Sequence, residues 1–295
     1  IISQGFADAD EHGRWLQEAI ARRARESGVR VMGPNTLGVV NNYRRLNTAF
    51  VEIPFPEKFL PVSLIAQTGF IQVASRNLAW RDIGKAIDVG NSCDVDIAEA
   101  LDYLADDPET QVIVVHMEGL KRGRAFLESA GRASRKKPVI VLKTGRSQAG
   151  ARAALSHSGS LVGEDQVYDA AFRRAGLLRV RDSREMRDAI HALAVLGEMR
   201  GPRLGVVTVT GAGGIMAADA CEEYGLTFGD VPAGLPEKLL QGLPDWVRVS
   251  NPIDIWPVGM LGNRYEPAWR ESLTEFLRSP GIDGVLAVFF VTDSA

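Results

Sequence analysis

Short apolar runs alternate with longer amphipathic stretches along the whole chain. A run such as residues 112–117 is hydrophobic at nearly every position, as in a strand that is buried on both faces of a sheet. A stretch such as residues 123–134 instead has its apolar side chains at helical spacing. This alternation is typical of helices that cover a parallel sheet. The sequence therefore predicts an α/β fold.

The alternation falls into two blocks. The first block ends before Arg200-Gly201-Pro202, which is the clearest linker signal in the chain. Its first helix, residues 15–27, should end at Gly28. Further helices are expected over residues 69–79, 96–104, 123–134, 166–175, 183–196 and 215–224. Strands are expected over residues 29–32, 62–66, 86–89, 112–117, 139–142, 204–209 and 285–291.

The composition argues against several classes of protein. With 295 residues, 45% of them hydrophobic and 24% charged, the chain can bury large cores and should hold two or more domains. A net charge of −3 argues against a nucleic-acid partner, which would require a basic surface. Only Cys93 and Cys221 are present, which suits a reducing cytoplasm and offers no Cys-based zinc site. Without a signal peptide or a membrane-spanning apolar run, we expect a cytoplasmic protein with no membrane partner.

His157 is the strongest candidate for a catalytic residue. It lies among small residues and follows the basic loop Lys143-Thr144-Gly145-Arg146. A neutral imidazole is a nucleophile near pH 7, and small neighbours leave room for a phosphoryl group. Its second nitrogen needs a partner, and Glu118, at the end of the apolar run 112–117, is the best candidate for that carboxylate. The pattern indicates a phosphohistidine, although a histidine without such neighbours is more often a surface or core residue.

Two glycine turns each join an expected strand to an expected helix, at residues 67–69 and 210–214. Free N–H groups at a helix N-terminus attract anions, and glycine lets the backbone approach phosphate closely. Either turn alone is more often a steric feature, but two turns beside a phosphohistidine indicate phosphate binding. The candidate phosphate-binding residues are Gln67, Thr68, Gly69, Ser158, Gly159, Gly211, Gly213 and Gly214.

Three other polar positions have simpler interpretations. His116 shares a strand face with Glu118, but we interpret it as a core or supporting residue. Lys143 at a strand end would attract an anion, yet a lysine there is also ordinary. Asn251-Pro252 is as consistent with a turn as with a site. No metal site is expected in this chain.

Six motifs in a fixed order carry a family resemblance. Together they resemble the ADP-forming acyl-CoA synthetases of the acetate–CoA ligase type, which are related to the succinyl-CoA synthetase α subunit. The resemblance covers nearly the whole chain, and the combination is far more specific than any single motif. The motifs are Gly33-Pro34-Asn35-Thr36-Leu37-Gly38, Asp88-Val89-Gly90-Asn91, Met117-Glu118-Gly119, Lys143-Thr144-Gly145-Arg146, Ser156-His157-Ser158-Gly159 and Asn251-Pro252-Ile253-Asp254.

The resemblance implies three domains. Residues 1–50 would be the tail of a Rossmann-like CoA-binding domain, in which Gly33, Pro34 and Asn35 match the end of the CoA site. Residues 51–198 would form a flavodoxin-like domain with the phosphohistidine loop. Residues 199–295 would begin a second flavodoxin-like ligase domain. Because the chain opens on Ile1 rather than methionine, we expect it to be a segment of a larger protein.

The resemblance also implies an activity and partners. The family interconverts acid, CoA and ATP with acyl-CoA, ADP and phosphate, through acyl phosphate and a phosphohistidine at the position of His157. Glu118 matches the acidic residue that supports this histidine. Nothing in the chain resembles the ATP-grasp module that binds ATP or ADP with Mg²⁺, so that module should be a partner subunit or a fused domain. We also expect an oligomer whose small substrates are a carboxylic acid or its acyl-CoA.

Two alternative functions belong to other classes. One is a non-catalytic CoA-binding regulatory module, as in family relatives that are fused to a lysine acetyltransferase. The presence of both His157 and Glu118 favours the enzyme, since a sensor would not need that pair. The other is a Rossmann oxidoreductase, which would require a Gly-x-Gly-x-x-Gly turn and a ribose-binding acid that this chain lacks.

Overall fold

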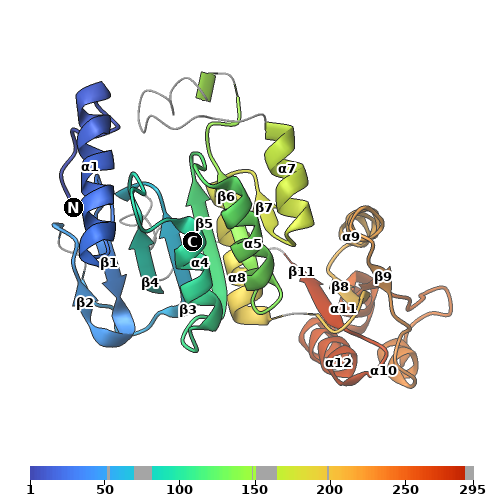
Figure 1. Ribbon diagram of the computed structural model, residues 1–295. Helices are drawn as coiled ribbons and strands as arrows, with labels where there is room; N and C mark the ends of the chain where they lie inside the picture. The colour runs from blue at the N-terminus through green and yellow to red at the C-terminus, as the bar shows by residue number, and fades with distance from the viewer. Residues whose placement is uncertain (52–53, 70–81, 148, 151–164, 198, 290–295) are drawn as a thin grey trace. The chain divides into compact units, whose positions relative to one another are not determined.

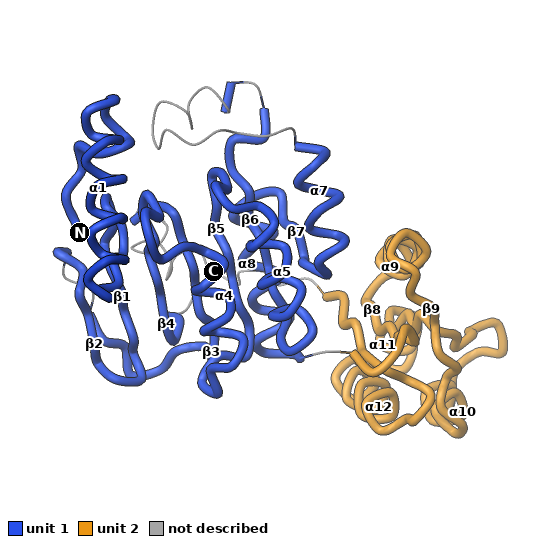
Figure 2. The backbone as a smooth tube through the Cα atoms, viewed as in Figure 1, with its two compact units in different colours: residues 1–197 blue, residues 198–295 orange. Residues whose placement is uncertain are grey.

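The structure, a computed structural model, describes residues 1–51, 54–69, 82–147, 149–150, 165–197 and 199–289. The chain divides into two compact units, Ile1–Gly197 and Glu198–Ala295 (Figure 2). Each unit has its own sheet and its own hydrophobic core. Residues 1–50 lie in the first unit and contribute two strands to its sheet. The three-part domain division expected from the sequence stays a prediction.

The strands of the first unit are β1 (Gly38–Asn41), β2 (Leu46–Asn47), β3 (Leu60–Ala66), β4 (Ile83–Asp88), β5 (Val112–Met117), β6 (Val139–Lys143) and β7 (Leu178–Val180). They form one sheet in the order β2-β1-β4-β3-β5-β6-β7 (Figure 1). Strands β3 to β7 are parallel, whereas β1 runs antiparallel to both neighbours. If the five parallel strands β3 to β7 are numbered 1 to 5 along the chain, their order across the sheet is 2-1-3-4-5. This is the flavodoxin-like arrangement. The predicted α/β fold with a mostly parallel sheet is confirmed.

The helices of the first unit are α1 (Glu11–Ser27), α4 (Ile97–Asp106), α5 (Gly123–Ser134), α7 (Asp165–Arg174) and α8 (Ser183–His191), with the 3₁₀ turn η1 (Asn42–Arg44) and the π-helical turn η2 (Ala192–Leu196). They pack against two opposite faces of the sheet (Figure 1). Leu101 of α4 and Phe126 of α5 share one core with Ile113, while Met186 of α8 shares the other with Val114. Neighbouring residues of β5 thus enter different cores, which explains its unbroken apolar run.

Local signals set the ends of α1. The Asp10 side chain accepts a hydrogen bond from the Gly13 N–H and caps the first turn. Gly28 has a left-handed conformation, with φ of 66°, and its N–H bonds to carbonyls of the last turn. The prediction that this helix ends at Gly28 is confirmed, although its start lies four residues before the expected position.

The strand expected over residues 29–32 is wrong. The Val31 N–H is donated to the Asp94 side chain at 2.8 Å, and the Val31 carbonyl accepts from the Val95 N–H at 3.1 Å. The backbone of Val31 therefore bonds to the loop after β4 and not to a neighbouring strand. The sheet instead gains β1 and β2, which the sequence did not indicate.

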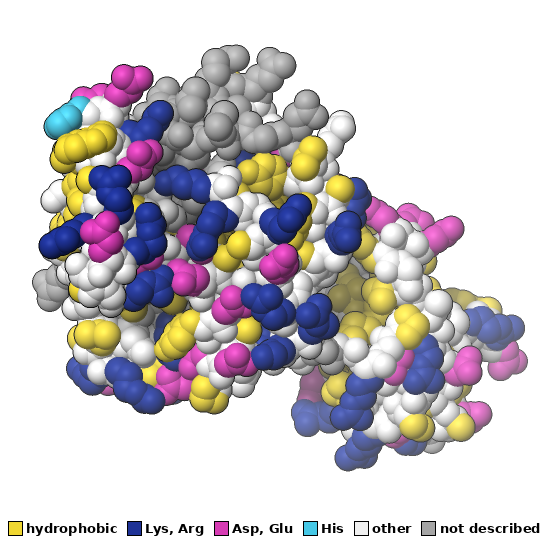
Figure 3. Space-filling view, in the orientation of Figure 1, with side chains coloured by type: hydrophobic (Ala, Val, Ile, Leu, Met, Phe, Trp, Pro, Cys, Tyr) yellow, Lys and Arg dark blue, Asp and Glu magenta, His cyan; other side chains and the backbone are white. Residues whose placement is uncertain are grey.

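Charged side chains of both signs cover the exposed faces of α4 and α5 (Figure 3). Arg132 of α5 bonds Asp102 of α4 at 2.9 Å, and Lys136, which follows α5, pairs with Asp106 at the end of α4. Since these groups are largely exposed, such pairs contribute little stability individually.

The strands of the second unit are β8 (Arg203–Thr208), β9 (Thr227–Phe228), β10 (Ile253–Asp254) and β11 (Gly284–Val288). They are parallel, with β8 between β10 and β11 and with β9 also paired to β8. The helices are α9 (Gly211–Glu223), α10 (Leu235–Leu240), α11 (Trp256–Gly262) and α12 (Tyr265–Arg278). None of the helices in the described part of either unit has the length and apolar character needed to cross a membrane.

Helix α9 begins at Gly211, so the expected start at residue 215 is wrong. The glycines that the sequence pattern assigns to a preceding turn form the first turn of the helix. Gly213 and Gly214 are buried there, and a Cβ atom would lie 2.5 Å from Thr208 Oγ1 at Gly213 and 3.2 Å from Pro252 at Gly214. Close packing of α9 on its sheet therefore requires glycine at Gly213.

Candidate functional site

Strands β3 and β5 lie side by side at the point where the strand order of the first unit reverses. In open α/β sheets, ligands bind at such switch points, beyond the carboxyl ends of the strands. Gln67 follows β3 directly, and Glu118 follows β5. The structure thus brings two of the predicted site residues to the same edge of the sheet.

Gln67 joins the two strand ends. Its Oε1 accepts hydrogen bonds from the Glu118 N–H at 2.6 Å and from the Gly119 N–H at 3.2 Å, and its Nε2 donates to the Gly119 carbonyl at 3.0 Å. These bonds hold the backbone of Glu118 in place, and the residue is only 8% exposed. The sequence assigned Gln67 to phosphate binding, whereas the structure gives its amide this supporting contact.

Replacing Gln67 by methionine should separate the two strand ends. The variant keeps the side-chain length but loses three hydrogen bonds, so we expect about 1–3 kcal/mol lower stability. Denaturant unfolding would measure this loss. Gln4→Met, at an exposed position, is the matched control, and an unchanged free energy of unfolding in Gln67→Met would contradict the expectation.

A cavity of about 470 Å³ lies next to this edge. The buried Asp88, at the end of β4, accepts hydrogen bonds from the Leu37 N–H at 2.7 Å and the Gly90 N–H at 3.1 Å. Burial raises the pKa of Asp88, and the nearby charge of Glu118 acts in the same direction. At Gly69, a Cβ atom would lie 2.4 Å from the Leu37 side chain. The cavity lining includes the predicted residues Asn35, Gln67, Thr68 and Gly69, with Leu37 and Asp88.

The Gly33-Pro34-Asn35 turn packs against the loop after β4. Gly33 and Pro34 are buried, and their carbonyls accept hydrogen bonds from the Cys93 N–H at 3.0 Å and the Asn91 N–H at 2.8 Å. Gly33 has φ of 91°, which favours glycine. Asn35 lines the cavity beside Gln67 and Asp88. The role of this turn in CoA binding stays a prediction.

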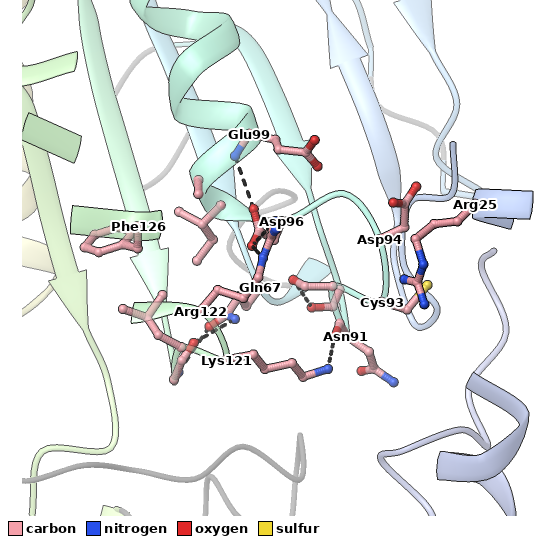
Figure 4. Close-up of a pocket in the computed structure, with 16 residues that line it drawn as sticks. Arg25, Gln67, Asn91, Cys93, Asp94, Asp96, Glu99, Lys121, Arg122 and Phe126 are labelled. Atoms are coloured by element: carbon pink, nitrogen blue, oxygen red, sulfur yellow. Dashed lines mark hydrogen bonds and ion pairs between the residues drawn. The ribbon is translucent and has the colours of Figure 1, made fainter. Parts of the chain in front are cut away.

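A second cavity, of about 280 Å³, shares Gln67 as part of its lining (Figure 4). Lys121 extends along it and donates to the Asn91 carbonyl at 2.7 Å. Asn91 in turn donates its amide to Asp8 at 2.7 Å and to Gln17 at 3.1 Å, so the N-terminal segment is tied to the site. Burial lowers the pKa of Lys121. Asn91 belongs to the motif Asp88-Val89-Gly90-Asn91, and its sequence alone did not indicate this role.

His116 is buried beside the site, on β5. Its Nε2 lies 3.3 Å from Thr144 Oγ1, and Nδ1 has no hydrogen-bond partner in the described structure. Burial, and then the charge of Lys143, lower the pKa of His116 to about 4, so the ring is neutral near pH 7. This agrees with the interpretation of His116 as a supporting core residue.

The low pKa of His116 should make the fold acid-sensitive. The unfolded chain takes up a proton near its ordinary pKa of 6.5, whereas the folded chain does so only near 4. As pH falls from 6.5 to 4, stability is therefore lost, by about 2–3 kcal/mol for this group. We expect His116→Gln to lose less stability than the native chain between pH 7 and pH 4.5 in denaturant unfolding. His12→Gln, at an exposed position, is the control, and equal losses in all three proteins would contradict the assignment.

Lys143 is also buried, at the end of β6. Its ammonium donates to the Thr144 carbonyl and lies 4.9 Å from the centre of the Tyr168 ring. Burial lowers its pKa. Lys143 is therefore a buried residue and not a surface lysine, and whether it attracts an anion stays a prediction.

In the second unit, Gly211 is exposed at the start of α9 and lies near Asp254, whose Oδ2 would be 3.4 Å from a Cβ at Gly211. Gly213 and Gly214 are accounted for by packing, so Gly211 has the most open backbone of the three.

His157, Ser158 and Gly159 lie outside the described residues. The described part of the chain has no group of three His, Cys, Asp or Glu side chains that would hold a metal ion. Binding of phosphate by both glycine turns stays a prediction.

Residues 61–193 match the model of the succinyl-CoA ligase-like flavodoxin domain. The chain is 40% identical over 281 residues to the α subunit of ADP-forming acetate–CoA ligase I from Pyrococcus furiosus, which covers 92% of this chain. It is 38% identical over 258 residues, 86% of its length, to ADP-forming acetate–CoA ligase from Methanocaldococcus jannaschii. Over most of its length the chain is thus similar to ADP-forming acetate–CoA ligases.

A solved structure of a similar protein has the same fold. It is the dinucleotide-forming acetyl-coenzyme A synthetase 1 of Candidatus Korarchaeum cryptofilum, in complex with phosphate and ADP. The TM-score is 0.87 at 32% identity, and the match covers 99% of this chain. The chain spans 62% of that protein, 59% of the Pyrococcus subunit and 36% of the Methanocaldococcus ligase. The family resemblance inferred from the motifs is confirmed.

Proposed function

We propose that this chain is the phosphohistidine-bearing part of an ADP-forming acyl-CoA synthetase. The observation that carries the proposal is the Gln67–Glu118 contact, which holds the backbone of the buried Glu118 at the switch point of the sheet. A carboxylate in that place can orient an imidazole and stabilise its cationic phosphoryl adduct. His157 is the residue that we assign to this imidazole. The family relatives are named as ligases, which supports the enzyme over a regulatory module of an acetyltransferase.

The proposed reaction has three balanced steps. His157 attacks the γ-phosphorus of ATP and releases ADP. A carboxylate oxygen of the acid then takes the phosphoryl group, which gives an acyl phosphate and a free imidazole. The CoA sulfur, after loss of its proton, attacks the acyl carbonyl and expels phosphate. The reverse sequence makes ATP from acyl-CoA, ADP and phosphate.

Within this chain, the edge formed by Gln67, Asp88 and Glu118 would serve the acyl half of the reaction. The glycine turns at Gly69 and Gly211 would offer N–H groups to phosphate. ATP or ADP with Mg²⁺ would be bound by an ATP-grasp subunit or fused domain, and CoA by the domain to which residues 1–50 belong. We further propose a cytoplasmic oligomer.

Labelling of the complete enzyme would test this function. With γ-labelled ATP and no CoA, we expect one acid-labile, alkali-stable phosphate on the peptide that contains His157. Addition of acid and CoA should then release the label as phosphate and form acyl-CoA. Formation of acyl-CoA with AMP as the product, or without a phosphoprotein, would contradict the proposal.

A further inference from the structure

The cavity of about 280 Å³ lies at the carboxyl ends of three neighbouring strands. Its wall consists mainly of the loops that follow β4 and β5, and it also includes Gln67, directly after β3. The strand order of the sheet reverses here, and open α/β sheets bind ligands at such a point. The proposed reaction uses none of the charged residues of this wall, so the cavity has no ligand assigned to it.

The three carboxylates of the wall already have cationic partners. Asp94 and Glu99 both pair with Arg30, at 3.0 Å and 2.6 Å. Asp96 pairs with Arg122 at 2.7 Å and caps α4 by accepting a hydrogen bond from the Glu99 N–H at 3.2 Å. Each of these carboxylates is therefore already neutralised.

Lys121 is a cation of the wall without such a partner (Figure 4). Among the described residues, its ammonium has one hydrogen bond, to the Asn91 carbonyl at 2.7 Å, and no ion pair. An ammonium has three N–H donors, so two remain for a ligand. Desolvation lowers the pKa of Lys121, while the charges of Arg14 and Glu18 on α1 act on it in opposite directions. Because a desolvated cation without a counterion is costly, an anion in the cavity would be favourable.

The rest of the wall suits a small acid with an apolar part. Ile97, Leu120 and Phe126 line the same cavity, and Arg25 of α1 adds a second positive charge to it. The volume is near the lower end of the range for ligand pockets, so the cavity admits a small acid but neither CoA nor a nucleotide.

We infer that this cavity binds a small carboxylate with a short apolar or aromatic tail, whose carboxylate bonds the Lys121 ammonium and whose tail packs against Leu120 and Phe126. The site is additional to the acyl edge, and the inference does not depend on the proposed function. Gln67 lies in the walls of both cavities, so an acid bound here lies next to the bonds that hold Glu118 without taking part in phosphoryl transfer.

Calorimetric titration of the complete enzyme with phenylacetate, without nucleotide or CoA, tests the site. We expect saturable binding with a Kd of about 1 mM or below. Lys121→Met should weaken it at least about tenfold, the loss typical of a hydrogen bond to a charged group. Lys121→Arg keeps the charge and should bind within about threefold of the native Kd.

The matched control is Lys136→Met, which removes a lysine that pairs with Asp106 outside the cavity wall. It should keep the native Kd. Native affinity in Lys121→Met would place phenylacetate elsewhere and overturn the inference. Failure of the native enzyme to bind phenylacetate saturably would overturn it as well.

A second variant tests the tail. Leu120→Ala removes apolar contact area but no charge, so phenylacetate should bind severalfold more weakly while acetate binds as it does to the native enzyme. Inorganic phosphate carries charge without a tail and should displace phenylacetate poorly. Displacement by phosphate at equal concentration would contradict the assignment to a carboxylate with a tail.

Reductive methylation of the native enzyme covers the case in which a variant does not fold. Lys121 and Lys136 are both exposed, so the reagent can reach them. With phenylacetate at five times its Kd, methylation of Lys121 should be about sixfold slower, since that ligand concentration leaves about one site in six free. Methylation of Lys136 should be unchanged, and equal protection of both lysines would overturn the site. An enzyme that forms no phosphohistidine would refute the proposed function but not this inference.

Discussion

His157→Ala in the complete enzyme is expected to abolish phosphoenzyme formation and to lower acyl-CoA synthesis by at least about 1,000-fold, or about 4 kcal/mol of activation free energy. The reason is that the imidazole forms the covalent intermediate itself, and alanine offers no substitute nucleophile. Labelling with ATP and a coupled assay of acyl-CoA formation would measure both effects.

The matched control for this variant is His12→Ala. His12 is exposed on α1, where it stacks on Trp15 with 5.8 Å between ring centres. It should keep the native rate. A folded His157→Ala enzyme with substantial turnover would show that the phosphoryl group reaches the acid by another route.

Glu118→Gln should have the next largest effect and should slow phosphoenzyme formation at least about 100-fold. The amide keeps the size of the carboxylate but loses the negative charge that would stabilise the cationic phosphohistidine. Because Gln67 binds the backbone of residue 118 rather than its side chain, the strand ends should stay joined. Thermal unfolding of the variant should therefore change little while single-turnover labelling slows.

Two further variants sharpen the test of Glu118. Glu118→Asp retains the charge at a shorter reach and should recover part of the lost rate. Glu128→Gln makes the same chemical change at an exposed position of α5 and should have no effect. If Glu118→Gln is labelled at the native rate, the Glu118 carboxylate has no role in the mechanism.

The elements that the sequence predicted best are those with their own local signal. The expected bounds of β5 and α5 agree with the structure, because an unbroken apolar run and a regular helical spacing each define an element without reference to distant residues. The strand β1 lacks such a signal. Its four residues become a strand by pairing with β4, and this contact depends on the tertiary fold.

The glycines of α9 show a second reason why the sequence alone did not predict the start of an element. A run with Gly211, Gly213 and Gly214 predicts a turn, because glycine weakens a helix. In the structure, two of these glycines allow α9 to approach Thr208 and Pro252, so packing outweighs helix propensity. Packing of this kind cannot be seen in the local sequence.

At the candidate site, the sequence indicated both Gln67 and Glu118 but not the bond between them. The two residues are 51 positions apart, and their meeting follows from the parallel pairing of β3 with β5. Asp88 was within a quoted motif, yet its burial and its bond from Leu37 appear only in the folded chain. Residue types and positions at strand ends were thus predictable, whereas the hydrogen-bond partners were not.

The antiparallel pairing of β1 with β4 limits where the flavodoxin-like sheet can be cut out of this chain. The matching flavodoxin-domain model covers residues 61–193, but in the protein the edge of that region is occupied by β1. A fragment that begins between β1 and β3 would leave β4 with unpaired backbone groups, which favour aggregation. It would also lose the Leu37 N–H that bonds to Asp88. A fragment that keeps this sheet intact should therefore begin before residue 37 and end in the linker around Gly201, so it is longer than the region that the domain model matches.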